Sequence, residues 1–144
     1  NGKLENLLHS EATARQFGVQ PTGHAGLGAK VSVGPDWFEV STSEDGSSPA
    51  AHLDHRNARD PFVLIESLSA LHAGVKASQG AFSLPFDGWL VKDGERISVE
   101  AATIAGDIRD VLKGIVHLEA NEVVTHQGVS PHVWVDGLAI TGEA

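Results

Sequence analysis

Histidine is the residue type whose number first suggests chemistry in this sequence. The chain has 144 residues and eight histidines, and imidazole is the commonest side-chain ligand for metal ions. His52, Asp54 and His55 lie within four residues and offer two imidazoles and a carboxylate. A zinc site needs three or four ligands on a rigid frame. Because the surrounding stretch is polar and has no apolar periodicity, we interpret this cluster as part of a solvated loop.

The remaining histidines give weaker indications of a site. His126 and His132 flank a turn that contains glycine and proline, so the two side chains could approach each other. His72 and His117 lie in apolar surroundings, which is typical of histidines in or near a core. None of these spacings predicts a metal site.

Several catalytic motifs are absent from the sequence. No histidine is followed by glutamate, and the chain has no cysteine, which excludes the zinc-protease helix and a thiol nucleophile within these residues. Gly23, Gly26 and Gly28 precede a strand-like stretch and not the helix that a phosphate-binding loop requires. Ser83 has no base or oxyanion hole indicated by spacing. We therefore expect no catalytic residue, no metal ligand and no cofactor in this chain.

Charge and composition exclude two classes of binding partner. The chain carries 19 acidic and 10 basic residues, a net charge of −9, and phosphate binding depends on lysine and arginine. No apolar run reaches the roughly 18 residues of a membrane helix. We expect neither a nucleic-acid nor a membrane partner, and a cytoplasmic location. The chain has no methionine, so we expect a piece of a longer protein.

Local patterns predict an α+β domain over residues 1–144. Its mostly antiparallel strands would form a barrel- or sandwich-like sheet with two short helices. The helices are expected over residues 3–17 and from Asp107 onward, where the side chain can cap the helix. Asp93-Gly94 between apolar stretches predicts a β-hairpin. Residues 41–60 are expected to form a long exposed loop. Other strands are expected at 31–33, 37–40, 62–65, 75–82, 89–91, 97–99, 133–135 and 138–140.

Three groups of motifs resemble the C-terminal region of the TldD/PmbA metallopeptidase family, which includes the TldE group. The N-terminal group combines a Gly-x-Leu entry with an Ala-Arg pair and a Thr-Gly loop. The central group matches a series of glycine-rich strand motifs, without a gap from Gly80 to Glu95. The C-terminal group matches the family's last strands. The matching residues are Gly2–Leu8, Ala14-Arg15, Gly18, Thr22-Gly23, Gly80–Ser83, Gly88–Glu95, Thr103–Asp107 and Ser130–Leu138.

The resemblance implies a role in peptide processing. TldD members are zinc metallopeptidases whose His-Glu-x-x-x-His motif lies upstream of the matched region and is joined by a cysteine near the C-terminus. Here the corresponding stretch reads 125–131, THQGVSP, without cysteine. This departure indicates the PmbA/TldE side, whose members lack the zinc site. Ala81 and Leu84 replace the family's acidic residue and arginine, while Asp107 replaces its asparagine and can still cap a helix.

The resemblance thus implies a C-terminal domain that shapes the peptide-binding cavity of a cytoplasmic zinc metallopeptidase system. Its partners would be a TldD-like catalytic subunit or an identical subunit, together with a peptide substrate. Zinc would belong to the partner subunit or to an upstream region. Since the chain has no catalytic motif, the sequence leaves open whether it belongs to an enzyme. The alternative is a non-enzymatic peptide- or protein-interaction domain.

Four residues are expected to line a peptide site at an exposed strand edge: Phe82, Ser83, Gly88 and Trp89. Glycine allows another backbone to approach closely, and an aromatic ring can cover an alternate side chain. The opposing interpretation is that Phe82 and Trp89 fill the core. Gly88→Val is expected to weaken peptide binding with little loss of stability.

Overall fold

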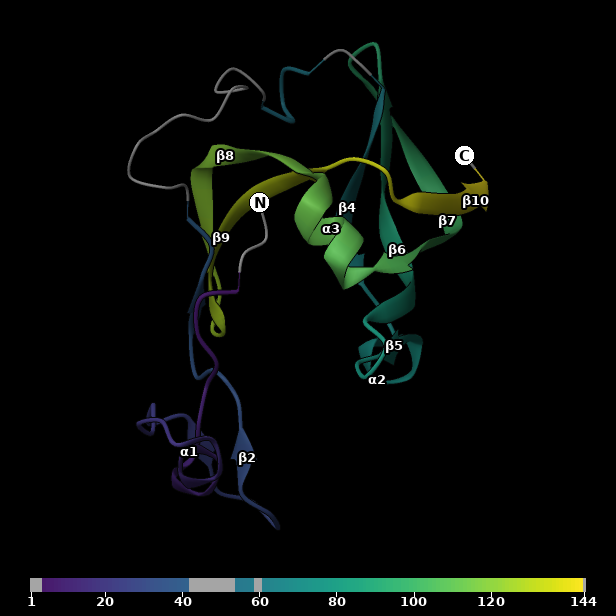
Figure 1. The fold of residues 1–144 in the computed structure, drawn as a ribbon. Coiled ribbons are helices and arrows are strands. Elements are labelled where there is room, and N and C mark those ends of the chain that lie inside the picture. The colour runs from purple at the N-terminus through teal and green to yellow at the C-terminus, as the bar shows by residue number, and fades with distance from the viewer. Residues whose placement is uncertain (1–3, 42–53, 59–60, 144) are drawn as a thin grey trace. The chain divides into compact units, whose positions relative to one another are not determined.

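The computed structural model of the protein describes residues 4–41, 54–58 and 61–143, which fall into two compact units (Figure 1). The larger unit contains the described residues of 54–121 and 132–143. The smaller unit contains residues 4–41 and 122–131.

A five-stranded antiparallel sheet forms the centre of the larger unit. Its strand order is β10-β7-β6-β4, and β5 also pairs with β6. The strands are β4 (Phe62–Leu68), β5 (Val75–Lys76), β6 (Ala81–Lys92), β7 (Glu95–Asp107) and β10 (Ala139–Glu143). Two helices belong to the same unit, α2 (Leu71–Gly74) and α3 (Ile108–Gly114). The helix α2 was not expected from the sequence.

The predicted hairpin is confirmed between β6 and β7. Lys92 pairs with Glu95 across the turn. Asp93 and Gly94 both have positive φ angles, 53° and 82°. Positive φ at both central residues is what a two-residue turn of type I′ requires, because its twist matches that of the flanking strands.

The core of the larger unit lies on one face of this hairpin. Leu84 and Phe86 on β6 are buried, and they pair with Ile104 and Ala102 on β7. Alternate residues of a strand point to the same face, so the four side chains form one apolar layer. The sheet is thereby held by burial as well as by backbone hydrogen bonds.

The predicted helix start at Asp107 is also confirmed. The Asp107 carboxylate accepts a hydrogen bond from the backbone N–H of Arg109 at 2.8 Å. The Arg109 guanidinium donates to the same carboxylate. These hydrogen bonds lower the pKa of Asp107 to about 2, so the cap stays charged at neutral pH and satisfies the otherwise free N–H group of Arg109.

The smaller unit consists mainly of short elements: α1 (Glu11–Phe17), β1 (Ala25–Gly26), β2 (Ser32–Val33) and β3 (Phe38–Glu39). Strand β1 pairs with β2 in a two-stranded antiparallel sheet. The strands β8 (Ile115–Val124) and β9 (Gly128–Val135) contribute residues to both units. They form a three-stranded sheet of order β3-β9-β8, in which β3 runs parallel to β9.

The prediction of a helix over residues 3–17 is wrong for its first part. Residues 4–10 have no regular secondary structure, and α1 begins at Glu11. Ser10 caps this helix: its side chain accepts from the Thr13 backbone N–H, and Thr13 Oγ1 accepts from the Ser10 backbone N–H at 2.9 Å. A reciprocal capping box fixes a helix start where apolar spacing alone does not.

Ser10→Ala is expected to weaken α1 by about 1 kcal/mol, because an N-cap side chain satisfies one otherwise free N–H group. Hydrogen exchange of the α1 amides should accelerate about fivefold, the factor that corresponds to this free energy. Ser78→Ala is the control, since Ser78 is exposed in the turn before β6. Equal effects of the two substitutions would contradict the capping role.

The observed fold agrees with the expected class in its main features. It is mostly antiparallel β structure with short helices, and the described residues contain three helices where two were expected. The path of the five-stranded sheet ends at β4 and at β10, so the described strands do not confirm a barrel. Among the described helices, none has the length and apolar character needed to span a membrane.

Candidate functional site

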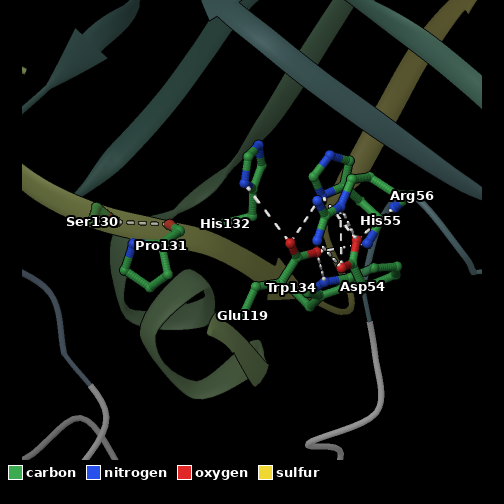
Figure 2. A network of polar contacts seen from close by, with 8 residues as sticks. All are labelled: Asp54, His55, Arg56, Glu119, Ser130, Pro131, His132 and Trp134. Atoms are coloured by element: carbon green, nitrogen blue, oxygen red, sulfur yellow. Dashed lines mark hydrogen bonds and ion pairs between the residues drawn. The ribbon is translucent and has the colours of Figure 1, made fainter. Parts of the chain in front are cut away.

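The buried carboxylate of Glu119 is the centre of a polar site in the larger unit. Glu119 lies on β8, and its side chain is only 2% exposed. Its Oε1 atom accepts hydrogen bonds from the His55 backbone N–H at 2.7 Å and from the Trp134 indole N–H at 2.8 Å. Its Oε2 atom lies 2.8 Å from His55 Nδ1. The carboxylate is thus held in one orientation by groups from two other segments (Figure 2).

The segment that carries His55 is a short hydrogen-bonded turn. The backbone carbonyl of Asp54 accepts from the N–H groups of Asn57 and Ala58, both at 2.9 Å. The Asp54 side chain forms an ion pair with Arg56. Hydrogen bonds from Arg56 lower the pKa of Asp54. This local pairing presents the His55 side chain, which is 17% exposed, to Glu119.

His132 is the third member of the site. It lies on β9 two residues before Trp134, so both side chains fall on the same face of the strand. The His132 Nδ1 atom is 3.9 Å from Glu119 Oε2. The rings of His132 and His55 lie side by side with centroids 4.2 Å apart. Figure 2 shows the Glu119 carboxylate facing both imidazoles.

Two opposing effects act on the pKa of Glu119. Burial raises it, because a charged carboxylate loses its hydration. Hydrogen bonds from His55 and Trp134 lower it and outweigh burial, so the pKa of Glu119 lies below its ordinary value. A carboxylate that is buried and still ionised at neutral pH can hold a proton on a neighbouring imidazole or take part in binding a cation.

The histidines that lie together in the structure are not the pairs that the sequence suggested. His52 lies outside the described residues, while Asp54 and His55 belong to the turn. His126 lies in the turn that joins β8 to β9, within the smaller unit. The sequence analysis did not identify Glu119 as a site residue. A glutamate within the apolar β8 segment could have indicated a buried polar site, because it shares a strand face with the buried His117.

Most of the expected loop at residues 41–60 lies outside the described residues. Ser41 is exposed and has no regular structure. The described residues 54–58 contain no helix or strand, as a loop prediction requires. They are nevertheless tied to Glu119 through His55, so this part of the segment has a defined position in the larger unit.

The expected peptide-lining residues all lie on β6, which is an inner strand of the sheet. Phe82 pairs with Val75 on β5 and with Gly106 on β7. Trp89 pairs with Leu64 on β4 and Ser98 on β7. At these positions both hydrogen-bonding edges of β6 are occupied, which corrects the expectation of an exposed edge.

Ser83 is exposed on β6. Peptide binding by Phe82, Ser83, Gly88 and Trp89 stays a prediction, and it would have to use side chains on the faces of the sheet.

The expected tolerance of Gly88 to substitution is wrong. Gly88 is buried, and a Cβ atom at this position would lie 2.0 Å from the Leu64 carbonyl oxygen. The backbone that approaches this glycine is that of β4. Gly88→Val would therefore disrupt the sheet, and a loss of peptide binding in that variant would not identify a binding residue.

An apolar cavity of about 530 Å³ lies within the larger unit. Its walls come from β4 to β7, from α3 and from the segment before β10, so α3 covers this face of the sheet (Figure 1). Phe82 is the one expected site residue among its lining residues. They are Ile65, Leu68, Val75, Ala77, Gly80, Phe82, Leu84, Ile104, Ile108, Val111 and Leu138.

Comparison with known proteins identifies the family. The model of the PmbA/TldA metallopeptidase C-terminal domain matches residues 1–142. The chain belongs to the PmbA/TldD family. A crystal structure from Thermotoga maritima MSB8, described as a candidate modulator of a DNA gyrase, is similar with a TM-score of 0.69 and 29% sequence identity. The match covers 97% of this chain and 31% of that one. No curated protein matches the chain.

Membership confirms the resemblance drawn from the motifs, and the match over residues 1–142 also includes the residues between the N-terminal and central motifs. The matched motif that ends at Asp107 forms the end of β7 and the cap of α3. The motif that begins at Gly80 forms the start of β6. In this family domain, the central motifs thus build the β6–β7 hairpin and the helix that follows it. The chain spans about a third of the length of the similar crystal structure.

Proposed function

We propose that this chain is the C-terminal domain of a PmbA/TldE-like component of a cytoplasmic zinc metallopeptidase system that acts on peptides. The observation that carries the proposal is the family match over residues 1–142. The 144 residues contain neither a His-Glu dipeptide nor a cysteine, so the domain lacks the family's zinc-protease motif. Its partner is a TldD-like catalytic subunit or an identical subunit.

The domain contributes to the peptide-binding cavity through the apolar cavity beside Phe82. Its volume of about 530 Å³ falls within the range of small-ligand sites. All its lining residues are apolar or glycine, so the occupant we propose is an apolar side chain of an extended peptide. Leu68 and Ile108 are 43% and 49% exposed, which leaves the rim of the cavity accessible.

Ile108→Ser tests this role, and Leu112→Ser is its matched control. Both residues lie on α3 and have similar exposure, 49% and 45%, but only Ile108 lines the cavity. The probe is a fluorescein-labelled, unfolded decapeptide with two leucines, and its fluorescence anisotropy reports binding. Ile108→Ser should weaken binding five- to tenfold, since about 1–1.5 kcal/mol of apolar burial is lost. Leu112→Ser should leave it unchanged.

A second probe replaces both leucines by serine and should not bind. Equal losses in the two variants, or no binding of the leucine peptide by the purified protein, would contradict the proposal. If the protein ignores the peptide but self-associates in sedimentation, and Ile108→Ser abolishes that association, the cavity serves the alternative function of protein interaction.

A further inference from the structure

The cluster of His55, Glu119 and His132 has the composition of a metal site. Each side chain offers one ligand atom, and these atoms all lie within 4.8 Å of one another. In a tetrahedral zinc site, bonds of about 2.0–2.1 Å place neighbouring ligand atoms roughly 3.4 Å apart. Rotation of the imidazoles about their side-chain bonds can bring the ligand atoms from the observed separations to those of a zinc site. The His132 side chain is 38% exposed and has room to rotate.

A second observation points to a missing ligand at the same place. The Nδ1 atom of His132 is buried and has no hydrogen-bond partner among the described residues. Buried polar atoms nearly always have a partner, so an unpaired one needs an explanation such as a bound ion or water. Glu119 Oε2 lies 3.9 Å from this atom, too far for a hydrogen bond. An ion between these atoms would satisfy both.

The surroundings of Glu119 are suited to holding a ligand in position. His55 and Trp134 donate their N–H groups to Oε1, which leaves Oε2 directed toward the two imidazoles. Hydrogen bonds of this kind orient a coordinating carboxylate and are part of most metal sites. Imidazoles bind a metal ion in their unprotonated form, so the carboxylate gives the three ligating side chains together a net negative charge, which favours a dication.

We propose that His55, Glu119 and His132 bind one divalent transition-metal ion of the zinc class, with water as the fourth ligand. Imidazole and carboxylate together suit zinc and its neighbours better than magnesium or calcium. A nitrogen that binds the ion carries no proton, so the proton of His55 Nδ1 moves to Nε2 of the same ring when Nδ1 coordinates. The site ties the 54–58 turn to β8 and β9. This proposal replaces our sequence-based expectation that the chain has no metal ligand. It does not depend on the proposed peptide function.

The experiment measures binding of Zn²⁺ to the purified protein after chelator treatment, by titration calorimetry and by metal analysis after dialysis. His132→Ala should bind one zinc ion fewer per chain than the wild type, or bind that ion at least tenfold more weakly. His132 is the best ligand to remove, because its Nδ1 has no hydrogen bond to lose. His72→Ala is the matched control, because His72 lies exposed on α2 and outside the cluster.

Two further measurements separate coordination from a structural effect. Zinc should raise the melting temperature of the wild type and of His72→Ala by more than that of His132→Ala. Trp134→Phe keeps the aromatic contact with Phe62 and removes the N–H donor, and it should weaken binding about tenfold.

Equal zinc binding by the wild type and His132→Ala would overturn the proposal, as would the absence of zinc binding by the wild type. Binding that survives His132→Ala but is abolished by His52→Ala would assign the ion to the 52–55 tract and would overturn it as well.

Discussion

Gly88→Ala is expected to lower the free energy of unfolding by about 3 kcal/mol or more, at the upper end of the cost of overpacking. A Cβ atom at Gly88 would lie 2.0 Å from the Leu64 carbonyl oxygen and 3.2 Å from Ile65 Cα. Gly88 pairs with Ile65 on β4 and with Val99 on β7. Because both neighbours are backbone in paired strands, neither can move away without breaking the sheet. Urea denaturation measures the loss.

Gly34→Ala is the matched control for this substitution. Apart from the adjoining residues, no described atom lies within 4 Å of the Cβ position at Gly34, so the added methyl group meets open space. The expected change is within about 0.5 kcal/mol, as for most surface substitutions. If Gly88→Ala and Gly34→Ala cost the same, the close approach of β4 to β6 is incorrect.

Glu119→Ala is expected to destabilise the protein by about 3 kcal/mol, because it leaves buried partners of a charged group unpaired. The lost contacts are those to the His55 backbone and ring and to the Trp134 indole N–H. Glu119→Gln should cost less, since its amide oxygen can still accept from Trp134. Urea denaturation in the presence of a chelator measures both variants without a metal contribution.

The pH dependence of this loss follows from the lowered pKa of Glu119. A pKa that is lower in the folded state than in the unfolded state stabilises the protein above the ordinary pKa of 4.5. That contribution is lost as the pH falls below 4.5 through the folded-state pKa. The stability difference between the wild type and Glu119→Gln should therefore be larger at pH 7 than at pH 4. A difference that stays constant across this range would contradict the ionised carboxylate.

Local sequence signals predicted those parts of the fold that depend on a few neighbouring residues. Asp93-Gly94 specifies the hairpin because both positions need positive φ. Asp107 specifies the start of α3 because its side chain satisfies the otherwise free N–H group of Arg109. Apolar runs indicated most of the strands, but with shorter bounds than β6 and β7 have in the structure, since pairing extends a strand beyond its apolar residues.

Apolar spacing failed in a segment whose apolar residues are exposed in the described structure. Leu4 and Leu7 have helical spacing, yet they are 73% and 57% exposed and precede the helix. Most helical stability in proteins comes from packing of an apolar face. The capping box at Ser10 sets the helix start instead. The short α2 was missed because four residues are too few for a periodic pattern.

The sequence by itself determined the family, the hairpin and the cap of α3, because each rests on residues close together in the chain. Only the tertiary structure decided the site at Glu119 and the role of Gly88. His55 and Glu119 are 64 positions apart and meet at 2.8 Å, and the strand that closes over Gly88 begins at Phe62. Contacts of this kind depend on strand pairing and turn position. Spacing within one segment therefore cannot indicate which distant carboxylate or backbone a residue will meet.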